Sequence, residues 1–431
     1  MRSANTFRRR RNLLSLEQLN FLFLRAAAFC LALFPDAAMI ALLLGGGLWF
    51  IRLMADKEFH FRRLPFDRAI LLFALIAGLS VLVSPDRAFS FYNYYHLVGM
   101  YLLAYLLTGQ LVRNEDQLRL IVEALAAAAI LVVAYGFYQF AFGIDTGQMK
   151  WVDGDAFPEL KKRVFSTWEN PNILAGYLNE VICFVFAFFM AVKERLGRVF
   201  LGGALLAIVA CLGMTYTRGA FLAIAVVIGV YGLLRDRRVL AVEIVAIMLA
   251  LTLDPLLMDR LTSALLAADT SSEMRLALWE STVDMIFDHS LLGIGWGAYW
   301  LVYPQYDFYI NDTAVKIVHA HNMYLNLAAE IGIFGALAYF WTFFGTLGMV
   351  LRHGAATPFV RSFRTGAALA LLSVALGGLT DDVVFNMPTS MLLWILLALM
   401  AASGEMSKED PRTQDLGRRA TETSNRGAEH R

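Results

Sequence analysis

The chain has 431 residues, of which 58% are hydrophobic and 17% are charged, and its formal net charge is +1. Soluble globular proteins carry about 25% charged residues and roughly 45–50% apolar ones. The composition therefore excludes a soluble enzyme, a disordered protein and a disulfide-rich scaffold, and it indicates a polytopic membrane protein. With a net charge near zero, the protein has no overall positive potential that would attract nucleic acid.

Twelve apolar runs are each close to the length that a helix needs to cross a bilayer core of about 30 Å. They lie at about 19–34, 37–54, 69–84, 90–112, 120–142, 171–192, 199–216, 219–234, 239–253, 322–351, 365–385 and 387–403. We predict an all-α integral membrane protein of about twelve transmembrane helices, with one large external loop between the ninth and the tenth. Because no small-residue cleavage site follows the first run, we interpret the N-terminus as an uncleaved anchor.

Lys and Arg residues are concentrated in the N-terminal tail and in alternate loops. Positive loops stay in the cytoplasm, so this bias predicts that both termini are cytoplasmic. Residues 1–18 would form a basic tail, 19–403 the transmembrane domain, and 404–431 a charged tail without ordered structure. Two long segments, 143–170 and 254–321, would then lie outside, and we expect any chemistry there.

The segment that follows the second external loop holds the sharpest candidate for catalysis. His321 stands where this loop enters the tenth predicted helix. At 100° per residue, four residues share its helix face: Leu325, Ala328, Gly332 and Gly335. Small residues let another helix approach closely, so His321 would be held rigidly as a general base. The alternative is an interfacial histidine hydrogen-bonded to the loop, and we expect His319, on another side, to be structural.

Three arginines lie in or beside the external segments. Arg163 ends the first segment, just before a predicted helix start at Pro171, a position that favours anions. Arg218 lies in a very short turn at membrane depth, where a charge is functional or paired. Arg275 lies on an amphipathic helix predicted over 272–289. Arginine binds phosphates through its planar fork, so the three indicate a lipid-linked diphosphate; a lipid contact or an ion pair are the alternatives.

Acidic and aromatic residues offer further candidates. Asp381 and Asp382 fall in the outer part of the eleventh predicted helix, where they would pair with an arginine or orient the histidine. Asp153 and Asp155 form a D-x-D motif that can hold a divalent metal but is more often a polar turn. The aromatic run 89–96 is typical of a belt at the membrane interface, with sugar stacking as the alternative.

His321 and Asn322, followed after nine residues by Gly332-Ile333-Phe334-Gly335, resemble the H-N-x9-G-x-x-G signature of the bacterial O-antigen ligase and polymerase superfamily. Three other segments fit the same pattern: 163–172, Thr217 to Ala220, and Arg275 to Gly295. The resemblance covers about 160–345 of the chain. The order, the spacing and the external placement of these motifs together make it specific.

This resemblance implies about twelve helices in a bacterial inner membrane, with a large periplasmic loop and a periplasmic active site. It implies transfer of a glycan from undecaprenyl diphosphate to an acceptor hydroxyl, with inversion and without a metal, a nucleotide or another cofactor. His321 would be the general base, and the donor diphosphate would be held by Arg218, Arg275 and Arg163. The supporting residues would be Asn322, Gly332, Gly335, Asp381 and Asp382.

Two activities within the superfamily share this donor and differ in the acceptor. A ligase uses lipid A-core and a polymerase uses another lipid-linked repeat; the single late loop and the fit around His321 favour the ligase. A transporter of lipid-linked oligosaccharides is the alternative from another class, but it needs cations along a path through the membrane, and these gather outside. The expected partners are the undecaprenyl-diphosphate-linked glycan, lipid A-core or another glycan, and membrane lipids, but no nucleic acid.

Overall fold

The computed structural model describes residues 15–55, 60–143, 163–253, 270–307, 316–352, 354–355, 357–382 and 386–406. These residues form helices and no strand, which confirms the predicted all-α class. Outside the described residues lie most of the two predicted tails and large parts of the loops in both external segments. The Asp153–Asp155 motif also lies outside them.

The first part of the chain, up to Phe142, is mainly helical in its described residues. The helices are α1 (Leu16–Cys30), α2 (Pro35–Ala55), α3 (Asp67–Ser80), η1 (Val81–Val83), α4 (Arg87–Asn93), the π-helical turn η2 (Tyr94–Val98), α5 (Gly99–Leu111) and α6 (Glu115–Phe142). Side-chain caps explain several of the starts, because Ser15, Asp86 and Asn114 each accept a hydrogen bond from an N–H in the first turn.

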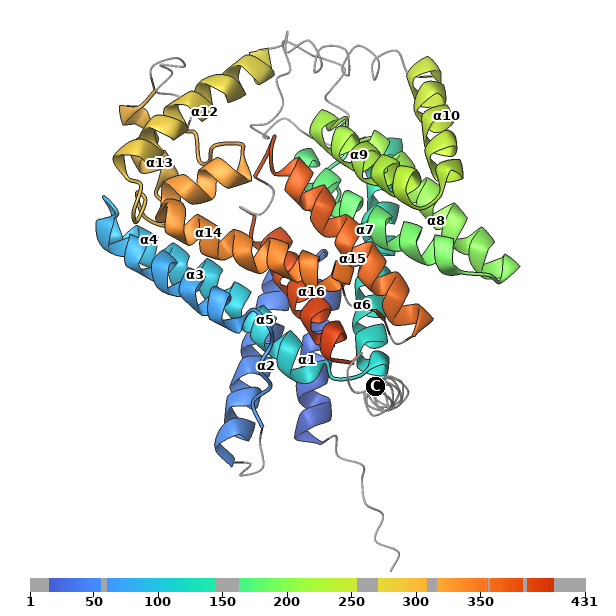
Figure 1. Ribbon diagram of the computed structural model, residues 1–431, viewed down its shortest axis with the longest axis horizontal. Helices are drawn as coiled ribbons and strands as arrows, with labels where there is room; N and C mark the ends of the chain where they lie inside the picture. Colours follow the sequence, from blue (N-terminus) through green and yellow to red (C-terminus); the bar gives the residue numbers. More distant parts are fainter. Residues whose placement is uncertain are drawn as a thin grey trace, which may run out of the picture.

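The second part of the chain begins with a run of four long helices. These are α7 (Pro171–Ala191), α8 (Arg195–Gly213), α9 (Arg218–Leu234) and α10 (Arg237–Leu253). The external segment follows with α12 (Thr270–Asp288), α13 (Tyr299–Val302) and η4 (Tyr303–Gln305). The chain then returns through α14 (Met323–Arg352), α15 (Pro358–Gly377) and α16 (Met387–Met406). Figure 1 shows α12 and α13 at the end of the molecule opposite to the start of α1.

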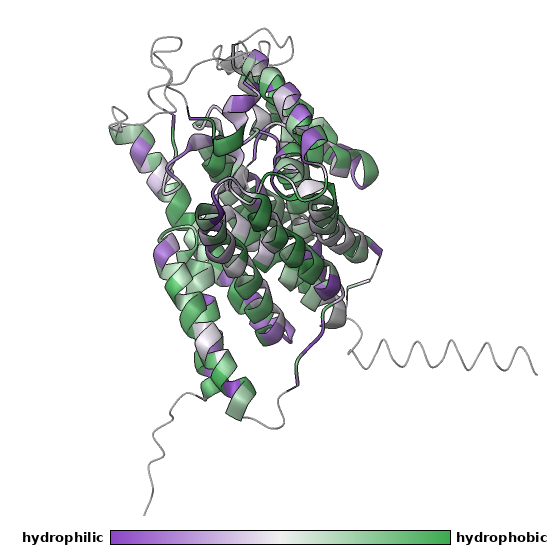
Figure 2. Ribbon diagram, turned by 90° about the vertical axis from the view of Figure 1, so that its left-hand side faces the viewer, coloured by the Kyte–Doolittle hydropathy of each residue, from purple (hydrophilic) through white to green (hydrophobic). Residues whose placement is uncertain are grey.

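Each of the twelve predicted runs overlaps one helix or a consecutive series of helical segments, although the eleventh, 365–385, extends past the end of α15 at Gly377. Within the described ranges, seven helices are by themselves long and apolar enough to cross a membrane: α2, α6, α7, α8, α14, α15 and α16. Figure 2 shows that the middle of the molecule is predominantly apolar. The polytopic membrane architecture is thus confirmed, and the count of twelve spans stays a prediction.

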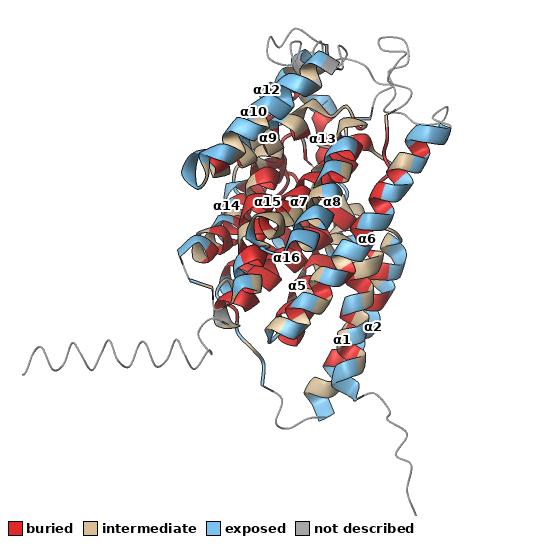
Figure 3. Ribbon diagram, turned by 90° about the vertical axis from the view of Figure 1, so that its right-hand side faces the viewer, coloured by how far each residue is buried: buried red, intermediate tan, exposed pale blue. Residues whose placement is uncertain are grey.

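The core is centred on α16. Of the apolar stretch of this helix, 89% is buried, whereas only 17% of the apolar stretch of α8 is buried. Trp394 of α16 is fully buried, and its ring stacks on Phe73 and Tyr101 with centroids 5.7 and 6.4 Å apart. Helix α16 packs on α5, and α15 packs on α7 (Figure 3). Exposed apolar faces on α2, α8 and α10 suit contact with lipid tails.

Helix α14 is interrupted at Gly332, whose backbone angles are φ 72° and ψ 172°. A break of this kind leaves carbonyl and N–H groups without their helical partners. The loop after α12 supplies partners through three hydrogen bonds: Ile294 N–H to Ala329 O at 2.9 Å, Gly295 N–H to Glu330 O at 3.0 Å, and Ile333 N–H to Ser290 O at 2.9 Å. The loop and the broken helix therefore form one structural unit.

Glycine is required on both sides of this contact. A Cβ on Gly332 would collide with the carbonyl oxygen of Leu291, and a Cβ on Gly293 would collide with the backbone of α14. Gly335 differs, because the nearest atoms to an added Cβ belong to Ile331 of the same helix. The prediction that these two glycines contact another helix is therefore wrong. Gly332 contacts the loop after α12, and Gly335 lies beneath a side chain of its own helix.

Candidate functional site

His321 and Asp381, the histidine–aspartate pair, face each other beside the start of α14. His321 Nδ1 lies 3.0 Å from Asp381 Oδ1, and the two side chains are 37% and 18% exposed. The sequence left two partners open for Asp381, and the structure pairs it with the histidine. Asp381 and Asp382 lie beyond the end of α15 at Gly377, so their predicted position within that helix is wrong; the chain turns out of the helix at two consecutive glycines.

The start of α14 and the end of α15 are tied together beside this pair. Met323 N–H donates to Gly378 O at 2.8 Å, and Asn322 Nδ2 donates to Leu379 O at 3.0 Å. Asn322 Oδ1 also accepts two N–H groups of the first turn of α14, at 3.0 and 3.1 Å. His321 precedes the helix with φ 48°, so the prediction that it lies on the face of a continuous helix is wrong.

A line of hydrogen bonds leads from Asp381 to Arg163. Asn172 Nδ2 donates to Asp381 Oδ2 at 3.1 Å, and Asn172 Oδ1 accepts from Arg163 Nη2 at 2.8 Å. The same guanidinium donates to Thr215 O at 2.7 Å and to Thr217 Oγ1 at 3.0 Å. Arg163 thus lies beside the N-terminus of α7, as predicted, but it is engaged with protein acceptors.

The turn before α9 brings Arg218 to the same region. Arg218 is the first residue of α9. Thr217, which occupies the N-cap position without a side-chain capping bond, accepts the hydrogen bond from Arg163 described above. Gly219 packs against Thr380, because an added Cβ would lie 2.6 Å from Thr380 Oγ1. Since Thr380 adjoins Asp381 in the chain, the start of α9 lies beside the histidine–aspartate pair.

Arg275 approaches the site from α12, which confirms the amphipathic helix predicted over 272–289. The helix packs on α14 and buries Leu278 and Met285. The charge of Arg275 shifts the pKa of Asp381 and of His319, so its guanidinium lies near both. Arg275 makes no hydrogen bond or ion pair with residues in the described ranges.

Burial and charge set the ionisation of this cluster. Burial by itself raises the pKa of Asp381, but the hydrogen bond from His321 and the nearby cationic groups, Arg275 among them, hold this pKa well below its usual range. Burial and the charge of His321 lower the pKa of His319 to about 4, against the opposing effect of Asp381. At neutral pH the cluster therefore contains an ionised carboxylate and a neutral His319.

This ionisation decides which nitrogen of His321 is available for chemistry. Because the carboxylate of Asp381 can only accept, Nδ1 of a neutral His321 carries the proton between them. Nε2 is then left with its lone pair and can take a proton from another molecule. The arrangement is that of an oriented general base.

His319 lies against His321, although the sequence placed it on another side. The ring centroids are 4.2 Å apart, and His321 N–H donates to His319 Nδ1 at 3.1 Å. His319 therefore holds the backbone of His321, in agreement with the structural role expected for it.

His319, His321 and Asp381 also have the residue types that bind metal ions, with one potential ligand atom from each within 4.8 Å of the others. Both Nδ1 atoms are already engaged, one with a backbone N–H and the other with the carboxylate. A cation bound through Nδ1 would have to displace one of these hydrogen bonds. Metal-independent activity stays our prediction.

Four residues other than glycine have a positive φ in the described ranges: Ser166, Glu169, Tyr216 and His321, at 51°, 58°, 50° and 48°. All four lie in the segments that lead into α7, α9 and α14. Such backbone costs on the order of 1–3 kcal/mol per residue and persists where surrounding contacts enforce it. Its clustering supports a functional site where these three helix starts meet.

The remaining predicted residues lie around the cluster. Asp382 N–H donates to Asp381 Oδ1 at 2.9 Å, and its side chain lines a cavity next to the site. Gly332 and Gly335 lie farther along α14 and act through the helix break described above.

Sequence reasoning did not single out Asn172, Thr217 or Glu330. Asn172 and Thr217 stand inside two of the segments that carry the family resemblance, but polar residues at a helix start are also typical of capping. Glu330 lies inside the apolar tenth run, where a buried acid is a functional candidate in its own right. An acidic residue inside an apolar run was the signal that could have identified Glu330 from the sequence.

Residues 203–340 match the family model described as O-antigen ligase. The matched part runs from α8 into α14 and includes Arg218, Arg275, His321 and Gly335. No curated protein matches the chain. Members of this family are glycosyltransferase-like enzymes, and the match confirms the resemblance that the motifs indicate. Over these residues the chain is similar to the O-antigen ligase family.

Proposed function

We propose that the protein is a membrane glycosyltransferase that moves a glycan from undecaprenyl diphosphate to a hydroxyl of an acceptor sugar. The observation that carries this proposal is the pairing of His321 Nδ1 with Asp381 at 3.0 Å, which leaves Nε2 available. The charge of Arg275 also acts on Asp381. An oriented base next to a guanidinium suits a reaction in which one reactant loses a proton and the other releases a phosphate.

In the proposed reaction the acceptor oxygen attacks the anomeric carbon of the donor. The bond between that carbon and the diphosphate oxygen breaks, and undecaprenyl diphosphate leaves with the bonding electron pair. His321 Nε2 takes the proton of the acceptor hydroxyl. One direct displacement of this kind inverts the configuration at the anomeric carbon.

Arg275 and Arg218 are the proposed contacts of the diphosphate. Negative charge grows on the leaving group as the bond breaks, so two guanidinium groups stabilise the transition state more than the ground state. Arg163 acts on the same step through Asn172, which it holds against Asp381. No metal or other cofactor takes part in this proposal.

The proposed place of the reaction is the periplasmic face of the bacterial inner membrane, with both termini in the cytoplasm. The distribution of Lys and Arg over alternate loops supports this orientation. In this proposal a lipid-linked donor enters the site from the membrane.

Lipid A-core is our proposed acceptor, which makes the protein an O-antigen ligase. The test is the lipopolysaccharide gel profile of a strain that lacks the protein, together with its undecaprenyl-linked glycans. Loss of the whole ladder, with polymerised glycan left on the carrier lipid, is the expected result. A single repeat on lipid A-core would identify a polymerase instead, and an unchanged profile would point to another acceptor.

Purified protein separates the enzyme from a transporter of lipid-linked oligosaccharides. The proposed enzyme transfers glycan in detergent micelles, where there is no second compartment and no gradient. A protein that only moves its substrate between leaflets would yield no covalent product under these conditions.

A further inference from the structure

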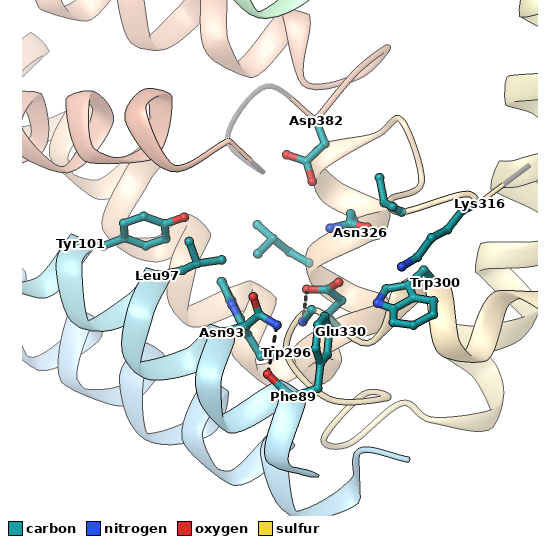
Figure 4. Close-up of a pocket in the computed structure, with 13 residues that line it drawn as sticks. Phe89, Asn93, Leu97, Tyr101, Trp296, Trp300, Lys316, Asn326, Glu330 and Asp382 are labelled. Carbon is teal, nitrogen blue, oxygen red and sulfur yellow. Dashed lines mark hydrogen bonds between the residues drawn. The ribbon is translucent and has the colours of Figure 1, made fainter. Parts of the chain in front are cut away.

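A cavity of about 190 Å³ lies between η2, the loop after α12 and the first half of α14. Its walls combine aromatic rings with carboxylate and amide groups, among them Trp296, Trp300, Asn93, Asn326 and Glu330. Figure 4 shows Asp382 entering this space from the side opposite to Phe89 and Asn93. Pockets for drug-sized ligands start at about 300 Å³, so this cavity suits a single ring.

Glu330 is the polar group that most clearly lacks a partner in this cavity. The residue is 3% exposed, and its Oε2 accepts from Gly297 N–H at 3.0 Å. Its Oε1 is buried and makes no hydrogen bond of regular geometry, although the backbone N–H of Tyr299 lies close enough to interact with the carboxylate. A buried acceptor in this state costs free energy unless a ligand supplies a donor.

The break in α14 is what presents this carboxylate. Gly332 lets the loop after α12 bond to the backbone of Ala329 and Glu330, and the same loop continues to Trp296 and Gly297. The loop thus brings one donor to Glu330 and one aromatic wall to the cavity. Glu330 is held from two directions, which leaves Oε1 as the atom available to a ligand.

Aromatic rings form the apolar part of the cavity. Phe89 and Trp300 meet edge to face with centroids 5.7 Å apart, and Lys316 Nζ lies 3.2 Å from the ring centre of Trp300. Such rings pack against the C–H face of a sugar, while carboxyl and amide oxygens accept hydrogen bonds from its hydroxyl groups. A cavity that offers both kinds of contact is suited to a sugar ring.

The cavity and the histidine–aspartate pair lie on two sides of the same short segment, 316–322. Val318 lines the cavity, and Ala320 N–H donates to Asn326 Oδ1, a cavity residue, at 3.2 Å. His321 of the same segment turns to Asp381. The neighbouring Asp382 lines the cavity, so a ring bound there would lie next to the base.

We propose that this cavity binds one sugar ring of the acceptor, one without an acidic group, and that Glu330 accepts a hydrogen bond from one of its hydroxyl groups. This inference rests on the proposed function and adds the place and the chemical class of the acceptor. The cavity is lined by two acidic side chains, Glu330 and Asp382, and by a single ammonium group, that of Lys316. A phosphate or a uronic acid would have to bury its own charge beside these two acids, whereas a neutral sugar would not.

Saturation-transfer NMR on the full-length protein in nanodiscs tests the binding directly. The probes are the methyl glycosides of glucose, galactose and N-acetylglucosamine, with methyl glucuronide as the acidic comparison. We expect signal from at least one neutral probe, none from the glucuronide, and about tenfold weaker binding in Glu330→Gln, which removes one acceptor with little change in shape. Equal binding by Glu330→Gln, no signal from any neutral probe, or preferred binding of glucuronide would overturn the proposal.

Glu180→Gln is the matched control. Glu180 of α7 is 5% exposed, its Oε2 has no hydrogen-bond partner, and it does not line the cavity. This variant carries the same chemical change at similar burial and should bind the neutral probe like the wild type. Weakened binding in both variants would assign the effect to the fold and sink the proposal.

Kinetics then separate this inference from the proposed function. With lipid A-core as acceptor, Glu330→Gln should raise KM for the acceptor about tenfold and leave KM for the donor unchanged. Transfer with an unchanged acceptor KM would reject the sugar site and keep the enzyme. Neutral-sugar binding that Glu330→Gln weakens, in a protein without transfer activity, would reject the enzyme and keep the sugar site.

Discussion

Two groups of side chains meet near the starts of α7, α9 and α14, and they differ in how far the protein itself satisfies them. The orienting chain consists of Arg163, Asn172, Asp381 and His321, each hydrogen-bonded to the next. The open groups are the guanidinium of Arg275 and Oε1 of Glu330, for which the described ranges provide no hydrogen-bond partner.

This difference separates groups that position from groups that bind. A polar side chain with all its partners inside the protein is fixed before substrate arrives, whereas an open one gains a partner only from a ligand. Changes in the orienting chain should therefore lower kcat, and changes in the open groups should raise a KM. The five predictions that follow test this separation, starting with the largest effect.

His321→Ala should reduce transfer by about 10³-fold or more, because the acceptor proton then has no base. The measurement is single-turnover transfer by purified protein, with thermal unfolding as a check on the fold. His289→Ala is the control, since His289 is exposed just beyond α12 and should retain full activity. Transfer at the wild-type rate by His321→Ala would remove the base from the mechanism.

Asp381→Asn should lower kcat about 10²-fold and leave both KM values nearly unchanged, because the imidazole loses the carboxylate that selects its tautomer. Steady-state kinetics with both substrates varied measure this effect. A kcat equal to that of the wild type would separate Asp381 from the histidine in function.

The stability of this variant has a defined pH dependence. The pKa of Asp381 is lower in the folded protein than the unfolded value of about 3.9, so its contribution to stability is complete above that pH and declines below it. The difference in Tm between the wild type and Asp381→Asn should therefore be largest near pH 7 and should shrink below about pH 4.

Arg275→Lys should raise KM for the lipid-diphosphate donor about tenfold with little change in Tm, because lysine keeps the charge and loses the fork. Arg218→Lys should change donor use in the same direction. Initial rates over a range of donor concentrations measure both effects. A lower Tm with an unchanged donor KM would move Arg275 into the orienting chain.

Arg163→Lys should reduce kcat a few-fold and lower Tm, with the donor KM unchanged. Lysine cannot bond at once to Thr215, Thr217 and Asn172, and each lost hydrogen bond costs about 1 kcal/mol. Steady-state kinetics and thermal unfolding of the same preparation give the answer. A rise in donor KM like that of Arg275→Lys would return Arg163 to the diphosphate, the role that the sequence predicts.

Chelation should have the smallest effect, because the proposed reaction needs no metal. Transfer in excess EDTA should stay within about twofold of the untreated rate, a ratio worth less than about 0.5 kcal/mol in the barrier. Loss of activity that Mg²⁺ restores would bring Asp153 and Asp155 into the mechanism. Restoration by Zn²⁺ alone would implicate His319, His321 and Asp381.

Much of the architecture could be predicted because it depends on local properties. Twelve apolar runs predicted the helices, since length and hydropathy decide where a chain can cross a bilayer. Asn-Pro before α7 predicted a capped start, and the amphipathic period over 272–289 predicted α12. Each of these signals lies within a few turns of the chain.

The errors arose where the fold departs from regular geometry. A continuous helical face from His321 to Gly335 assumed 100° per residue, but α14 begins after His321 and breaks at Gly332. The glycine has a second use that spacing does not reveal, namely contact with a loop some forty residues earlier in the chain. Asp381 was likewise assigned to a helix that ends at Gly377.

Composition, periodicity and motif order predict the class of protein, the helices and the resemblance to the O-antigen ligase family, because they are properties of the linear chain. The folded arrangement was needed to learn that Asp381 pairs with His321, that Arg163 donates to acceptors of the protein, and that Glu330 lines a cavity. These choices depend on contacts between distant parts of the chain, such as the 60-residue separation of His321 and Asp381 and the 52-residue separation of Arg163 and Thr215. Such contacts exist only after the helix ends have packed together, and no local pattern encodes them.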